Sequence, residues 1–323
     1  MYSRIANQTK ALIGLGATAV LLLTACSSTT SDNTNAPTAT ASEASTAPSN
    51  EIVNAWVGPP IDLSKIPLGD GDTSTKSAKV GSVFSCQGGN PGAGGATDDV
   101  PWIHGKTWNL DEKLAVKGDI AWPAADFSVS VSGGKRTIKT NALPVDTKTG
   151  KFPVSQSDPA YEYDRNPNSI DKHKSTIKLP TSPTPANKVN CLPMGEIGIM
   201  LNGVFLFNAL DAPGRDAVAH EIQDLCDGHP EQGDTYHYHD VAQCLQKSTT
   251  GSSTVVGWAN DGYPVVLERD PSGNLPTNAD LDECHGRTSE ILIDGQLVSS
   301  YHYSATVEYP YTLGCFHGTD VVS

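Results

Sequence analysis

The residues best suited to chemistry form a short alternating motif, Tyr236-His237-Tyr238-His239. In a β-strand, side chains two residues apart share a face, so His237 and His239 would point one way and the two tyrosines the other. Two imidazoles on one face can ligate a single borderline ion such as Zn²⁺ or Cu²⁺. The motif therefore predicts part of a divalent-metal site. The alternative is that the histidines only hydrogen-bond to backbone or carboxylate groups while the tyrosines pack in the core.

A second copy of the motif, Tyr301-His302-Tyr303-Ser304, occurs downstream, and the landmarks around the two copies come in one order. Gly198–Val204 resembles Gly257–Tyr263. A cysteine follows each of these segments at a similar separation, 23 residues after Gly203 and 22 after Gly262. This order predicts an internal duplication whose halves pack about a pseudo-twofold axis, with convergence of short Gly-rich turns as the alternative.

Such an axis would bring the two copies together, so we expect His302 to supply a third metal ligand. Ser304 would leave the fourth position open or filled by water, as in catalytic zinc sites. Acidic residues near both copies could orient the ligands from behind, namely Asp240, Asp261 and Asp282. His229 and His285 lie beside cysteines in turns, where ligation and capping are both open.

A calcium site is a lesser alternative. Asn278, Asp280 and Asp282 alternate as in the first half of an EF-hand loop, but Glu283 stands where that loop needs glycine and Ser289 where it needs its last ligand. An irregular Ca²⁺ site built from scattered acids is all that this pattern would allow.

The first residues predict export. Residues 1–10 carry Arg4 and Lys10, residues 11–24 are apolar, and Leu23-Thr24-Ala25-Cys26 looks like a bacterial lipobox. The resemblance implies cleavage before Cys26 and a lipid attached to Cys26, which would anchor the protein in the cell envelope. With Ser27 as the next residue, the expected location is the outer membrane of a Gram-negative bacterium. The alternative is a plain signal peptide followed by a free Cys. Residues 26–50 then predict a flexible Ser/Thr/Ala-rich tether.

Charge excludes several classes of partner. The chain has 22 basic and 36 acidic residues, for a net charge of −14. Removing residues 1–25 leaves 20 basic residues and a net charge of −16. Such a chain would repel the phosphate backbone of nucleic acids. It also contains no Walker-type loop, no Gly-x-Ser-x-Gly and no His-Glu-x-x-His, so nucleotide binding is not expected.

Export also favours disulfides among the six cysteines that remain after Cys26. Spacing alone leaves fifteen pairings. The repeat favours Cys226–Cys244 and Cys284–Cys315, because each pair brackets one copy of the motif, and that leaves Cys86–Cys191. There is no Cys-x-x-Cys pair, so a structural zinc site made of cysteines is not expected.

The residue patterns predict a mainly β, sandwich-like domain with long loops and few short helices. Residues 51–190 would form an N-terminal β region, and residues 191–323 a core with two diverged repeats. Hairpins are predicted at Phe127–Thr140, turned by Gly133-Gly134, and at Ile197–Phe207, turned by Asn202-Gly203. Short strands are expected at 255–259, 263–267, 290–293 and 299–307. A helix is expected at 213–226 and a long proline-rich loop at 150–190.

Several short motifs of the chain resemble those of the bacterial YHYH domain family. The resemblance rests on Tyr236–His239, Cys226–Pro230, Leu201–Gly203, Asn278–Asp282 and Tyr309–Phe316, with weaker likeness at Pro101–His104, Trp122-Pro123 and Asp158–Ile170. It spans about residues 100–318 and implies no activity. In relatives the second copy tends to be Tyr-His-Tyr-His as well, so Ser304 puts any role that needs four histidines in doubt.

Two functions remain open at this point. One is a metal site at His237, His239 and His302, serving hydrolysis or metal handling. The other is a non-catalytic surface module, anchored in the lipid bilayer, that binds a glycan or an envelope protein through exposed aromatic side chains.

Overall fold

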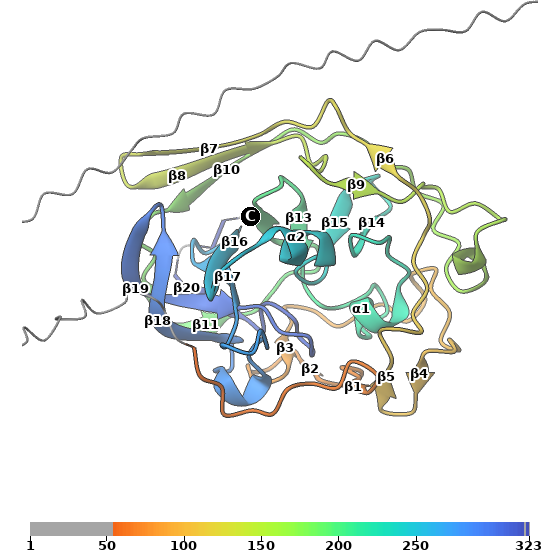
Figure 1. The fold of residues 1–323 in the computed structure, drawn as a ribbon, viewed down its shortest axis with the longest axis horizontal. Helices are drawn as coiled ribbons and strands as arrows, with labels where there is room; N and C mark the ends of the chain where they lie inside the picture. Colours follow the sequence, from red (N-terminus) through yellow and green to blue (C-terminus); the bar gives the residue numbers. More distant parts are fainter. Residues whose placement is uncertain (1–53, 320, 323) are drawn as a thin grey trace, which may run out of the picture. The chain divides into compact units, whose positions relative to one another are not determined.

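The computed structural model describes residues 54–319, 321 and 322 (Figure 1). The predicted signal peptide, Cys26 and the tether lie outside these residues. The described residues belong to one compact unit. Within the described part, no helix is long and apolar enough to cross a bilayer.

The unit is built on an eight-stranded sheet in which the equivalent strands of the two repeats follow in the same order from the two ends. In space the order is β14-β15-β13-β12-β16-β17-β19-β18. The first four strands belong to one repeat and the last four to the other, and corresponding strands sit at equal distances from the centre. The strands are β12 (Glu196–Met200), β13 (Phe205–Phe207), β14 (Gly228–Pro230), β15 (Tyr236–Tyr238), β16 (Ser253–Ala259), β17 (Pro264–Glu268), β18 (Gly286–Ile293) and β19 (Gln296–Ser304).

Strand directions follow the same symmetry. The pairs β12–β13 and β16–β17 are antiparallel hairpins, β13–β15 and β17–β19 are parallel, and β14–β15 and β18–β19 are antiparallel. The two halves meet where β12 pairs antiparallel with β16, with Ile199 opposite Trp258. The structure thus has the pseudo-twofold arrangement that the repeated landmarks predict.

A smaller sheet packs on one face of the large one. Strands β7 (Phe127–Ser132), β8 (Lys135–Thr140) and β10 (Ser175–Pro180) form an antiparallel sheet, seen along the upper edge of Figure 1. Ile138 and Leu179 from this sheet share a core with Ile199, Phe205 and Trp258 of the large sheet. The expected sandwich-like packing is confirmed. Gly133 and Gly134 make the predicted turn with φ of 57° and 72°, a region that glycine enters without a steric penalty.

The opposite face of the large sheet carries the main core. Its side chains include Met200, Leu206 and Val265, which pack with Tyr238 and Tyr303 of the two motifs. The remaining elements are short strands and helical turns. They are β1 (Ile66–Pro67), β2 (Thr73–Ser74), β3 (Val83–Phe84), β4 (Ile103–His104), β5 (Thr107–Trp108), β6 (Ile120–Ala121), β9 (Lys148–Thr149), η1 (Pro159–Glu162), β11 (Pro185–Asn190), α1 (Ala217–His220), α2 (Gln243–Ser248), η2 (Asn278–Asp280) and β20 (Phe316–Gly318). Of these, η1 contributes Ala160 to a separate small core around Trp102.

Two local predictions are wrong in extent. The helix expected at 213–226 is only α1, because Asp216 caps its start and Glu221 already has extended backbone at its end. The proline-rich loop expected at 150–190 holds two six-residue strands, β10 and β11. Both strands find partners far away in sequence, β8 and β20, which local patterning could not reveal.

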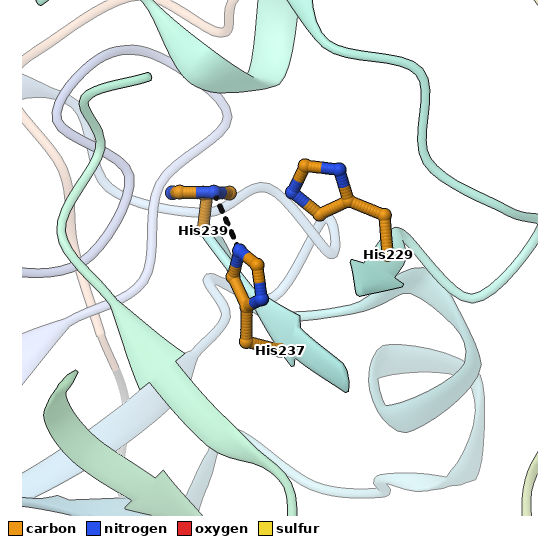
Figure 2. Close-up of side chains that lie close together, drawn as sticks. All are labelled: His229, His237 and His239. Atoms are coloured by element: carbon orange, nitrogen blue, oxygen red, sulfur yellow. Dashed lines mark hydrogen bonds between the residues drawn. The ribbon is translucent and has the colours of Figure 1, made fainter. Parts of the chain in front are cut away.

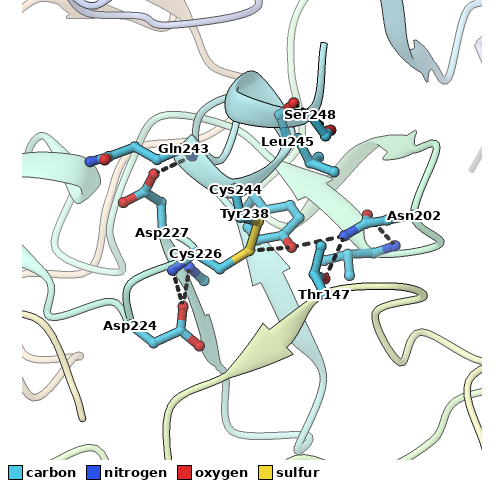
Figure 3. The surroundings of a disulfide bond; sticks show 12 residues. Thr147, Asn202, Asp224, Cys226, Asp227, Tyr238, Gln243, Cys244, Leu245 and Ser248 are labelled. Atoms are coloured by element: carbon cyan, nitrogen blue, oxygen red, sulfur yellow. Dashed lines mark hydrogen bonds between the residues drawn. A yellow bond between two sulfur atoms is a disulfide. The ribbon is translucent and has the colours of Figure 1, made fainter. Parts of the chain in front are cut away.

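All three predicted disulfides are present, joining Cys86 to Cys191, Cys226 to Cys244 and Cys284 to Cys315. Figure 3 shows the second of these beside Tyr238, whose hydroxyl accepts a hydrogen bond from Asn202 at 3.0 Å. The side chain of Asp224 accepts from the backbone N–H groups of Cys226 and Gly228. In the other repeat Asp282 does the same for Cys284 and Gly286. The turns that carry the two cysteines are therefore held in the same way.

Candidate metal centre

Three histidines of the first repeat converge at one end of its strands. His237 and His239 come from β15 and the residue after it, and His229 comes from the adjacent strand β14, directly opposite His237 (Figure 2). Each offers one ring nitrogen, and these three atoms lie within 4.8 Å of one another. All three side chains are buried, at 2 to 4% exposure. The alternation of the motif places His237 and His239 on the same face, as the sequence predicts.

Backbone carbonyls fix the protonation of two of the rings. Nδ1 of His237 lies 3.1 Å from the carbonyl oxygen of Thr235, and Nδ1 of His239 lies 2.5 Å from that of Asn208. A carbonyl oxygen only accepts hydrogen bonds, so each Nδ1 carries a proton, and in the neutral tautomer that this fixes, Nε2 is the bare nitrogen. These two Nε2 atoms face each other at 3.1 Å. Two lone pairs at this distance repel each other unless a proton or a metal ion lies between them.

The spacing suits a metal ion. Nitrogens bound at about 2.0–2.1 Å to a tetrahedral ion lie about 3.3 Å apart, close to the separation seen here. His229 adds a third donor whose two ring nitrogens make no hydrogen bond within the described residues. A buried imidazole without partners is costly, and a metal ion would satisfy it.

Burial favours the neutral, ligating form of His229 and His237 by lowering the pKa of each. It lowers the pKa of His229 well below its usual value, and the neighbouring His237 and His239 lower it further. Burial and His239 likewise lower the pKa of His237. Phe207 stacks on the His237 ring, with centroids 4.0 Å apart, and holds its orientation.

A carboxylate that the sequence did not single out completes the cluster. Oε2 of Glu221 lies 3.2 Å from Nε2 of His239 and 3.4 Å from Nε2 of His229, and it makes no hydrogen bond within the described residues. Glu221 follows α1, inside the segment for which a longer helix was predicted, so no local pattern marked it. The position of His229 after Cys226-Asp-Gly was a visible clue, but spacing did not decide between ligation and capping.

The cluster lines a cavity of about 560 Å³. The cavity wall also includes Asp164, whose pKa burial raises to about 6, and amide side chains such as Asn166. A metal ion at the histidines would therefore have room for water or a small ligand beside it.

The structure does not bring His302 to this cluster, and the expectation of a third ligand across the pseudo-axis is wrong. In the sheet, β15 is the second strand from one end and β19 is the second strand from the other end. The axis therefore keeps the two motif copies apart. Nε2 of His302 instead lies 3.0 Å from Oε2 of Glu268.

The three acids expected behind the ligands also lie elsewhere. Asp261 accepts a hydrogen bond from the Tyr303 hydroxyl, and Asp282 accepts one from Tyr301. Asp240 lines a separate cavity with Lys113. The carboxylates of the calcium alternative bond to backbone N–H groups: Asp280 binds that of Thr277 and Asp282 that of Cys284.

The fold and the site describe a mainly β domain with a duplicated motif, in which one copy carries a buried histidine cluster. The family model described as YHYH protein matches residues 176–276, about a third of the chain. The match covers the first motif and ends before the second. No curated protein and no solved structure matches the chain.

Proposed function

We propose that this protein binds one divalent transition-metal ion, such as Zn²⁺ or Cu²⁺, through His229, His237 and His239. The observation that carries the proposal is the pair of bare Nε2 atoms 3.1 Å apart, each fixed by a carbonyl oxygen on the other side of its ring. Glu221 stands beside this ion as a further oxygen donor or as the acceptor for a bound water. The adjoining cavity supports exchange of the ion or binding of a small ligand.

Metal analysis of the purified full chain tests this proposal. The chain is loaded with Zn²⁺, Cu²⁺ or Ni²⁺ at neutral pH, freed of excess ion and analysed for metal content. The wild type should retain about one ion per chain, and the double variant His237→Ala/His239→Ala should retain none. The matched control is His302→Ala, which removes the corresponding histidine of the second repeat and should retain the ion.

Thermal unfolding gives an independent measurement. A ligand at about 100 times its Kd stabilises the folded state by about 2.7 kcal/mol, so the ion should raise the Tm of the wild type and of His302→Ala but not of the double variant. A folded wild type that holds no stoichiometric ion would contradict the proposal. It would favour the surface module that binds a glycan or an envelope protein.

We further propose that the protein acts in the cell envelope, held to the bilayer by a lipid on Cys26. The support is the sequence Leu23-Thr24-Ala25-Cys26 after an apolar segment. Cells fed a labelled fatty acid should incorporate the label into the wild type but not into Cys26→Ser. Equal labelling of both chains would contradict the anchor.

A further inference from the structure

The second repeat carries different residues at the positions that form the histidine cluster in the first. β14 pairs with β15 and β18 pairs with β19 in the same register, so Arg287 stands opposite His302 as His229 stands opposite His237. At the last position of the motif, the second repeat has Ser304 where the first repeat has His239. The parallel pairing of β13 with β15 and of β17 with β19 likewise places Glu268 where the first repeat has Ala209.

The equivalent histidines share one backbone contact. Nδ1 of His302 lies 3.0 Å from the carbonyl oxygen of Ser300, just as Nδ1 of His237 lies 3.1 Å from that of Thr235. The ring therefore presents Nε2 to the same place, relative to its strands, as His237 does.

In the second repeat an internal charge cluster fills this place. Glu268 is completely buried, and its Oε2 lies 3.0 Å from Nε2 of His302 and 3.4 Å from Nε of Arg287. The hydroxyl of Ser304 donates a hydrogen bond to the same oxygen at 2.8 Å. Burial by itself would raise the pKa of Glu268, but His302, Arg287 and Ser304 together hold it below its usual value. The guanidinium thus supplies the positive charge that a metal ion would supply in the first repeat.

Arg287 also reaches the start of the described chain. Its guanidinium donates a hydrogen bond to the side chain of Asn54 at 3.3 Å and lies over the ring of Trp56, 4.7 Å from the centroid. Asn54 is 2% exposed and donates in turn to the backbone carbonyl of Ser252 at 2.6 Å.

We infer that the second repeat is a latent divalent-metal site, in which the Glu268–Arg287 ion pair takes the place of the ion and Arg287 fastens residues 54–56 to the sheet. The ligand set assumed for the latent site rests on the proposed function of the first repeat. The two motif copies then have different tasks: the first holds a metal ion and the second holds the beginning of the folded unit.

The decisive variant copies the first repeat into the second. Glu268→Ala, Arg287→His and Ser304→His are combined in the full chain, and zinc content is compared with that of the wild type. The triple variant should bind one ion more per chain. Adding His302→Ala should remove this extra ion, whereas adding His237→Ala should remove the ion of the first repeat.

The result separates the two proposals. If the wild type binds no zinc and the triple variant gains an ion that depends on His302, the proposed function fails and the latent site stands. If the triple variant is folded by circular dichroism and binds no more zinc than the wild type, the latent site is overturned. If the triple variant does not fold, the double variant Arg287→His/Ser304→His, which keeps Glu268 as an oxygen donor, is judged by the same gain of one ion.

The fastening role has its own measurement, which requires no metal. Hydrogen exchange in peptides that cover residues 54–60 should become faster in Arg287→Met. It should stay unchanged in the control Arg165→Met, which removes the cation 5.7 Å from the Tyr161 ring centroid in another part of the unit. Unchanged exchange in Arg287→Met would overturn this role.

Discussion

Ile199 and Trp258 face each other across the centre of the sheet. The two residues occupy equivalent positions, Ile199 in the first repeat and Trp258 in the second. The pseudo-twofold axis therefore passes through this pair. The axis relates the two motif copies but places them at opposite ends of an eight-stranded sheet. One metal site shared between the copies is for this reason not possible, and each copy must be judged by its own surroundings.

Glu221 should strengthen metal binding without being essential to it. Residues beside the ligands typically change metal affinity 10–100-fold, so Glu221→Gln should weaken zinc affinity by about that factor, and His237→Ala should weaken it more. Competition with a chelating dye measures both. Glu231→Gln is the control, because Glu231 lines the same cavity but accepts hydrogen bonds from the backbone of Gly233. Equal weakening by the two glutamate variants would refute a specific role for Glu221.

The tyrosines of the two motifs should differ in their contribution to stability. The Tyr303 hydroxyl donates to the buried carboxylate of Asp261, whereas the Tyr238 hydroxyl bonds to the neutral amide of Asn202. A hydrogen bond to a charged group contributes about 1.5–3 kcal/mol and a neutral one about 1 kcal/mol. Tyr303→Phe should therefore lower the free energy of unfolding in urea more than Tyr238→Phe. The reverse order would show that the charge of Asp261 is satisfied without Tyr303.

His285 should make the protein sensitive to acid. Its Nε2 faces the hydroxyl of Thr306, which donates to the backbone carbonyl of Glu308, and its buried Nδ1 has no partner within the described residues. Burial lowers the pKa of His285 from 6.5 to about 3. Below pH 6.5 the unfolded chain takes up a proton at this residue that the folded chain does not, so stability is lost as the pH falls towards 3, by about 1.4 kcal/mol per pH unit.

The variant His285→Asn tests this pH dependence. Asparagine tolerates the φ of 67° at this position, and the equivalent residue of the first repeat is Asp227 with φ of 59°. In urea unfolding of the metal-free protein between pH 7.5 and 4.5, the stability of the wild type relative to the variant should decrease with falling pH. Because other titrating groups are common to both proteins, a constant difference would refute the assignment.

Two of the disulfides should differ in what they contribute, one mainly to stability and the other mainly to metal binding. In the loop-entropy description, the cross-link over 105 residues between Cys86 and Cys191 contributes about 4.7 kcal/mol, and that over 18 residues between Cys226 and Cys244 about 3 kcal/mol. Replacing the first pair by alanines should lower the Tm more. Replacing the second should weaken zinc binding more, because Cys226 lies three residues before His229. If only the Cys86–Cys191 variant lost affinity, the order of β14 would not depend on its disulfide.

Much of the fold could be predicted because its determinants are local. The Gly133-Gly134 and Asn202-Gly203 turns, the alternation in β7 and β8, and the repeated cysteine spacing each specify their own neighbourhood. The site was half predictable for the same reason: a period of two places His237 and His239 on one face wherever the strand lies. His229 and Glu221 reach the cluster through strand pairing and through the end of α1, and neither contact has a fixed spacing from the motif.

The sequence by itself indicated the duplication, favoured the three disulfide pairs that the structure contains, and placed two imidazoles on one face. Only the tertiary structure decided that the axis separates the motif copies instead of joining them, because the strand order of a sheet depends on contacts between distant segments. It also decided that Glu268 and Arg287 meet His302, since the pairing of β19 with both β17 and β18 brings their side chains to one point. The same motif can therefore present a metal-binding cluster in one half of the sheet and an ion pair in the other.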